Sequence, residues 1–179
     1  DTDAEGTLYA AGNFMDKVEY TGADGVKAEM TGSTDAYTAF IAKISADGKF
    51  QQVKTLASTA NETVAASMMY FPMTGDMYVT PRKIQVEGDR IYVSVNYAGD
   101  VAELSWKGSY INVSDFMYMD NKNVGLFAMN KADFSETKSI ATVQNTETVS
   151  YNQYYAEAFD FTVENGTVYA GFIGFGNLT

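Results

Sequence analysis

Alternating apolar and polar side chains are the main pattern along this chain. Residues 89–97 show it most clearly: one set of alternate positions holds Ile91, Val93, Val95 and Tyr97, and the other holds Tyr92, Ser94 and Asn96. A period of two residues is typical of a β-strand, whose side chains point to opposite faces of a sheet. No segment sustains the period of an amphipathic helix. The pattern therefore predicts an all-β fold.

The strand pattern occurs three times, each time with a tyrosine at the same place, namely Tyr9, Tyr92 and Tyr169. A second repeated pattern is an apolar run that ends in a turn. Residues 38–50 and residues 124–134 align so that Ala-Asp follows the apolar run in both copies. The first copy continues into another strand over residues 51–56. These copies predict two hairpins in equivalent positions.

Two further hairpins are predicted just before the second and third tyrosine strands. Residues 83–86 turn at Glu-Gly-Asp, and residues 159–163 turn at Glu-Asn-Gly. Asn-Gly is the strongest short hairpin signal, because both residues tolerate positive φ.

Four strands per repeated unit is the make-up of a β-propeller blade. We expect one all-β domain, residues 1–179, built as a partial β-propeller of tandem four-stranded antiparallel blade-like sheets. Its units are residues 5–87, residues 88–164 and an incomplete unit at residues 165–179. The alternative is a two-sheet β-sandwich.

The first unit also carries a motif, formed by Tyr-Ala-Ala-Gly-Asn-Phe at residues 9–14 and Asp-Ala-Tyr-Thr-Ala-Phe-Ile-Ala-Lys-Ile at residues 35–44, followed by Asp47-Gly48. It resembles bacterial β-propeller repeats that couple a Tyr-x-x-Gly strand to an Asp-Ala-Phe-x-Ala-Lys strand. The second unit departs from it, with Met129 in place of the lysine. The resemblance implies an exported protein, extracellular, at the cell surface or periplasmic, whose blades form a non-catalytic binding or scaffold module.

Closed propellers need about four or more blades, and two units with a fragment cannot close a ring. We expect the chain to belong to a longer propeller, to complete its sheets with another chain, or to pack as a sandwich. Neither end shows a polar outer strand, so both terminal sheets should expose apolar surface. The chain should therefore self-associate or bind the missing repeats.

Charge and composition exclude several classes of function. The net charge is −11, with 23 acidic against 12 basic residues scattered along the chain. This disfavours nucleic acid and anionic membranes, which require clustered Lys and Arg. No apolar run is long enough to insert in a membrane. The chain has no Cys and no His, which removes disulfides, common zinc sites and Ser-His or Cys-His catalytic pairs.

The candidate binding residues lie in the connection that differs most between the units. Residues 16–35 of the first unit form a polar connection rich in Gly and Thr, whereas residues 100–123 of the second are rich in aromatic side chains. Aromatic rings stack on sugars, so we expect glycan contacts at Trp106, Tyr110 and Tyr118. The alternative is that these rings fill space between sheets.

Paired carboxylates keep a second function open, a carbohydrate-active hydrolase. Asp115 and Asp120 are one such pair. Residues 120–123 are rich in side-chain oxygen atoms, so a bound calcium ion is possible there, although they lack the spacing of an EF-hand loop. We expect no other cofactor and no catalytic residues.

Overall fold

The computed structural model describes residues 1–34, 36–59, 77–108, 123–144 and 155–175, and for residues 155–159 and 175 it describes the backbone alone. Within these ranges the fold is all-β, as the alternation predicts, with a short 3-10 helix at Ala102–Leu104. The strands are β1 (Leu8–Phe14), β2 (Lys17–Thr21), β3 (Lys27–Thr31), β4 (Ala36–Ile44), β5 (Phe50–Leu56), β6 (Met77–Glu87), β7 (Arg90–Ala98), β8 (Asn123–Asn130), β9 (Lys138–Val143), β10 (Tyr155–Glu164) and β11 (Thr167–Phe175).

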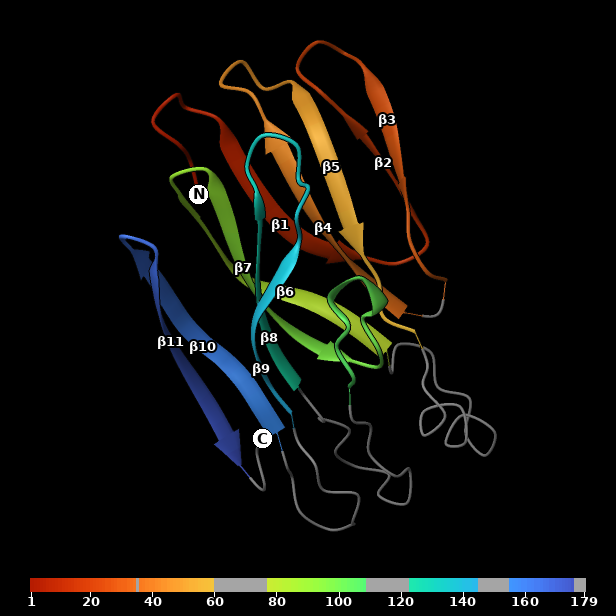
Figure 1. The fold of residues 1–179 in the computed structure, drawn as a ribbon. Coiled ribbons are helices and arrows are strands. Elements are labelled where there is room, and N and C mark those ends of the chain that lie inside the picture. The colour runs from red at the N-terminus through yellow and green to blue at the C-terminus, as the bar shows by residue number, and fades with distance from the viewer. Residues whose placement is uncertain (35, 60–76, 109–122, 145–154, 176–179) are drawn as a thin grey trace.

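The described strands form one seven-stranded sheet and two two-stranded sheets, β10-β11 and β2-β3. The seven-stranded sheet has two antiparallel parts, named sheet 1 and sheet 2, and these follow one another in chain order with β10-β11 as sheet 3 (Figure 1). Sheet 1 is the antiparallel set β1-β4-β5, sheet 2 is the antiparallel set β6-β7-β8-β9, and sheet 3 is the pair β10-β11. Sheets 1 and 2 are joined through a parallel contact between β4 and β6 that involves two residue pairs, Ala36 with Met77 and Tyr37 with Tyr78. The described strands form no closed barrel.

The four predicted hairpins, β4–β5, β6–β7, β8–β9 and β10–β11, are all confirmed. Between β10 and β11, Asn165 and Gly166 both have positive φ, 51° and 74°, which is the pattern of a type I′ turn. Between β6 and β7, Gly88 has a φ of 60°. Short turns of this kind fix the pairing register of the strands that they join.

The two central strands of sheet 2, β7 and β8, are buried on both faces. On one face Ile91 and Val93 belong to a core that also contains Tyr9 and Ile41 of sheet 1. On the other face a second core contains Tyr92, Leu126 and Ala128 together with Phe161 and Val163 of sheet 3. The sheets are therefore stacked in the order 1, 2, 3. A third layer means that a two-sheet sandwich does not describe the fold.

Polar side chains also join sheets 2 and 3. The amide of Gln85 on β6 donates to the carbonyl of Val163 at 3.0 Å and accepts from its N–H at 3.1 Å. Lys83 Nζ lies 2.5 Å from Asp160 Oδ1 and donates to the carbonyl of Phe161 at 2.5 Å. These contacts occupy part of the edge of β10 that faces away from β11.

The expected polar connection at residues 16–35 is instead mostly a hairpin, β2–β3. Its inner positions are Val18 and Tyr20 on one strand and Ala28 and Met30 on the other, so a short alternation was present in the sequence. The alternation is hard to recognise in the sequence because the outer positions are charged and each strand is short.

The β2–β3 hairpin changes the expectation for the N-terminal sheet. The hairpin lies against the outer face of sheet 1, where the rings of Tyr20 and Phe50 are 4.3 Å apart and Met30 is buried. The hairpin therefore covers part of the outer face of sheet 1. Sheet 3 does expose apolar side chains, because Tyr169 is 58% and Ile173 is 45% exposed.

Candidate binding groove

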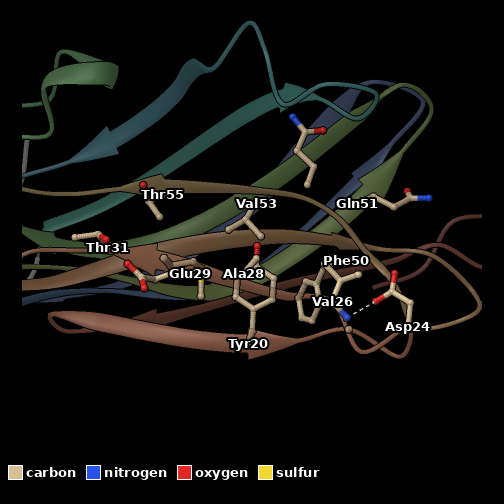
Figure 2. A pocket seen from close by; sticks show the side chains of 13 residues that line it. Tyr20, Asp24, Val26, Ala28, Glu29, Thr31, Phe50, Gln51, Val53 and Thr55 are labelled. Atoms are coloured by element: carbon tan, nitrogen blue, oxygen red, sulfur yellow. Dashed lines mark hydrogen bonds between the residues drawn. The ribbon is translucent and has the colours of Figure 1, made fainter.

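A groove with a volume of about 450 Å³ lies between the β2–β3 hairpin and β5 (Figure 2). One wall comes from the hairpin, with Tyr20, Glu29 and Thr31, and the other comes from β5, with Gln51 and Thr55. Since the hairpin is inserted between β1 and β4, the groove has no counterpart between β7 and β8 in the described part of the second unit.

Backbone hydrogen bonds hold the hairpin at both ends of the groove. At its base the N–H of Asp16 donates to the carbonyl of Ser33, and the N–H of Gly32 donates to the carbonyl of Asp16, both at 2.7 Å. At its tip the N–H of Ala23 donates to the carbonyl of Gly48 at 3.0 Å. A Cβ at Gly48, where φ is 82°, would lie 2.9 Å from Cβ of Ala23. The glycine therefore lets the β4–β5 turn approach the hairpin.

Two aromatic rings supply apolar surface in the groove. Tyr20 and Phe50 are both half-buried, and their rings meet at an angle of 50°. Val53 and Ala28 add aliphatic surface beside them. This apolar part lies next to polar side chains in the same groove.

The polar part contains carboxylates, amides and hydroxyls. Asp24 Oδ1 accepts a hydrogen bond from the N–H of Val26 at 3.0 Å, which fixes the hairpin turn (Figure 2). Glu29 forms an ion pair with Lys17 across the hairpin. Gln51 is exposed on β5. The amide of Gln52 is directed away from the groove, because its Nε2 donates to the carbonyl of Asp133, in the β8–β9 turn, at 2.5 Å. The groove therefore offers acceptors and donors around an aromatic surface.

Trp106 lies in the core and not at an exposed site. It is 4% exposed, its ring stacks on Tyr97 at 5.0 Å, and its Nε1 donates to Ser139 Oγ at 2.7 Å. The segment after β7 folds back through a bridge between Val101 and Trp106, which places the indole against Gly125. The expected glycan contact at Trp106 is therefore replaced by a structural role.

Tyr110 and Tyr118, the other two expected contacts, lie outside the described residues, as do Asp115 and Asp120. The structure therefore does not bring the three expected residues together. In the described part of the chain, no three acidic side chains are grouped so that they could hold a metal ion. The sequence analysis did not predict the groove; the alternation within β2–β3 indicates one of its two walls, the hairpin.

Among the described residues, every carboxyl group with a displaced pKa has its pKa lowered. Lys49 and Ser45 lower the pKa of Asp47 to about 2, and Lys83 lowers the pKa of Asp160. Hydrogen bonds from Ser135 lower the pKa of Asp133. Burial raises the pKa of Asp3, but hydrogen bonds from Thr7 and Tyr9 and the charge of Lys131 outweigh it and leave the pKa lowered. A glycosidase acid requires a raised pKa, and these carboxyl groups are displaced the opposite way.

A scan against models of protein families and searches of curated proteins and of solved structures find no match. The class that the fold defines is therefore an all-β protein of stacked antiparallel sheets, with an inserted hairpin that forms a groove. None of the helices within the described ranges is long and apolar enough to cross a membrane.

Proposed function

We propose that this protein is a non-catalytic binding and scaffold module of the β-propeller type, acting outside the cell, and that the groove between the β2–β3 hairpin and β5 binds a neutral glycan. The observation that supports this most is the inserted hairpin itself. In a protein built of repeated strands, the segments added to the repeated frame carry the specific function. Here the insertion creates a groove.

The chemistry of the groove suits a sugar. Its volume of about 450 Å³ is in the range of small-molecule sites, roughly 300 to 1,000 Å³. The rings of Tyr20 and Phe50 offer apolar surface to sugar C–H groups, while Gln51 and Glu29 can exchange hydrogen bonds with hydroxyl groups. The carboxylates of Asp24 and Glu29, on a chain of net charge −11, disfavour an anionic ligand.

The stacked sheets support the scaffold part of the proposal. β1, β7 and β11 carry the equivalent tyrosines Tyr9, Tyr92 and Tyr169, and sheet 2 is a four-stranded antiparallel set in chain order. Repeats that bury both faces of each sheet are typical of blades. Under this proposal the partners are a glycan and further repeats or another chain.

Retention on immobilised neutral polysaccharides tests the proposal. We expect Thr31→Ala and Gln51→Ala, both at exposed residues of the groove, to reduce retention. Thr21→Ala is the matched control, because Thr21 is an exposed residue of the same hairpin outside the groove. Circular dichroism of each variant checks that the fold is kept.

The same samples are assayed for released reducing ends. Retention without release, weakened by the groove variants alone, supports the proposal. Equal retention by all variants would show that the groove is not the site. Release of reducing ends that a single Asp or Glu substitution abolishes would instead indicate the carbohydrate-active hydrolase.

A further inference from the structure

The turn between β10 and β11 holds the only Asn-Gly pair of the sequence, Asn165-Gly166, and every other asparagine is followed by a residue with a side chain. Asparagine is one of the thermolabile residues of proteins, because its side-chain amide can react with the backbone nitrogen of the residue that follows. A side chain on that following residue hinders the attack. Both turn residues are exposed to water. Asn165 is therefore the asparagine most open to this reaction.

The reaction is an intramolecular deamidation. The backbone nitrogen of Gly166 forms a bond to Cγ of Asn165, the bond between Cγ and Nδ2 breaks, and the proton of the Gly166 N–H leaves with Nδ2 as ammonia. Water then opens the resulting five-membered succinimide. Attack at Cγ gives aspartate, whereas attack at the main-chain carbonyl gives isoaspartate, in which the chain continues through Cγ. Water is the only co-reactant.

The conformation of the folded turn opposes the first step. Asn165 and Gly166 have φ values of 51° and 74°, as in a type I′ turn. In such a turn ψ at the first central residue is about +30°, which directs the nitrogen of Gly166 away from Cβ of Asn165. Closing a five-membered ring requires the nitrogen and Cβ to lie on the same side of the Cα–C bond. The side-chain amide therefore cannot be attacked while the turn keeps this shape.

Contacts with sheet 2 hold the strands on either side of the turn. Val163, paired with Val168, is 3% exposed and belongs to the second core. Gln85 Nε2 donates to the carbonyl of Val163 at 3.0 Å, and Gln85 Oε1 accepts from its N–H at 3.1 Å. Beyond this pair, Glu164 and Thr167 are exposed. Since exposed hairpin ends open at a low cost in free energy, Gln85 limits how far the opening proceeds from the tip.

We infer that Asn165 is a site of spontaneous deamidation that is controlled by the opening of the β10–β11 turn. The folded turn blocks the attack of the Gly166 nitrogen, and the reaction proceeds only from the fraction of molecules in which the turn is open. The inference is independent of the glycan groove, which lies at sheet 1.

The isoaspartate product prevents the turn from forming again. It adds one carbon atom to the main chain, which a two-residue turn does not accommodate, and the register of β10 and β11 depends on that turn. Both products also place a new negative charge beside the exposed Glu164. Each opening that leads to reaction therefore weakens the hairpin irreversibly.

Peptide mapping by mass spectrometry tests the inference on the 179-residue protein at mildly alkaline pH, in buffer and in guanidinium chloride. Conversion of Asn165 to aspartate and isoaspartate should be at least about tenfold slower in buffer, because only the open fraction of the turn reacts. Gly166→Ala, compared in guanidinium chloride where the fold plays no part, should react more slowly than wild type. Equal rates for the wild type in the two solutions would overturn the inference.

Gln85→Ala tests the control by the fold. Loss of both hydrogen bonds to Val163 should accelerate the reaction in buffer and leave its rate in guanidinium chloride unchanged. Thr21→Ala, an exposed residue on the β2–β3 hairpin, is the matched control and should react as the wild type does in both solutions. Circular dichroism checks that each variant is folded. A folded Gln85→Ala protein with the wild-type rate in buffer, or faster conversion of another asparagine in guanidinium chloride, would contradict the inference.

Discussion

Trp106 and Gly125 illustrate how single residues determine the core of sheet 2. A Cβ at Gly125 would lie 2.1 Å from Cη2 of the Trp106 indole, so the ring occupies the space that a side chain at residue 125 would need. The indole in turn stacks on Tyr97 and meets Phe127 edge-on at 6.1 Å. Trp106 and Gly125 therefore depend on each other for their packing.

We expect Trp106→Ala to lower the free energy of unfolding by about 3–5 kcal/mol, the usual cost of removing a large buried aromatic side chain. Gly125→Ala should cost about 3 kcal/mol through overpacking. The two costs should not add, because the truncated Trp106 leaves room for a methyl group at residue 125. Urea denaturation of the two single variants and the double variant measures this. Additive costs would show that the two residues do not share one space.

The ion pair between Lys83 and Asp160 makes the contact of sheets 2 and 3 sensitive to acid. The ammonium of Lys83 and then the N–H of Phe161 lower the pKa of Asp160 from its ordinary value of 3.8. A folded-state pKa below that of the unfolded chain means that the stabilisation is complete above pH 3.8 and is lost as the pH falls through the folded-state pKa.

Asp160→Asn should therefore lower the Tm near pH 6, and the difference from wild type should shrink as the pH falls below 3.8. Thermal unfolding of both proteins over this pH range is the measurement. The same difference at every pH would mean that Asp160 acts through packing or through its backbone hydrogen bond and not through its charge.

At the scale of elements, the β2–β3 hairpin forms the proposed binding groove, whereas the repeated strands form the rest of the fold. Its base is closed by hydrogen bonds between Asp16 and residues Gly32 and Ser33, so a short Gly-Ser linker can replace residues 17–31. We expect this replacement to abolish glycan retention while sheets 2 and 3 stay folded. Removing the cover of the outer face of sheet 1 should also lower the Tm. Retained binding would place the glycan site elsewhere.

The sequence predicts an element well when the residues that determine its conformation lie within the element itself. Asn165-Gly166 requires positive φ at both residues, and this cause acts within the hairpin β10–β11 itself. The role of Trp106 could not be predicted in this way, because it depends on the absence of a side chain at Gly125, which belongs to a different strand. The groove was missed because its walls come from two hairpins that meet only in the folded chain.

At the scale of the whole molecule, the two cores explain why β7 and β8 are buried along most of their length. The alternation of apolar and polar residues over residues 91–97 predicts that one face of the strand is exposed to solvent, yet Ser94 and Asn96 are buried as well. Sheet 3 covers part of that second face, including Tyr92. A period-two pattern identifies a strand, whereas the layers on its two faces depend on segments distant in sequence.

The central claim is that sheet 2 packs against sheet 1 on one face and against sheet 3 on the other, and methyl–methyl nuclear Overhauser effects test it most directly. The account predicts effects between the methyl groups of Ile41 or Leu56 and those of Val93 or Val95 in the first core. It also predicts effects between Leu126 and Val163 in the second core. Effects from one face of sheet 2 alone would contradict the stack of three sheets.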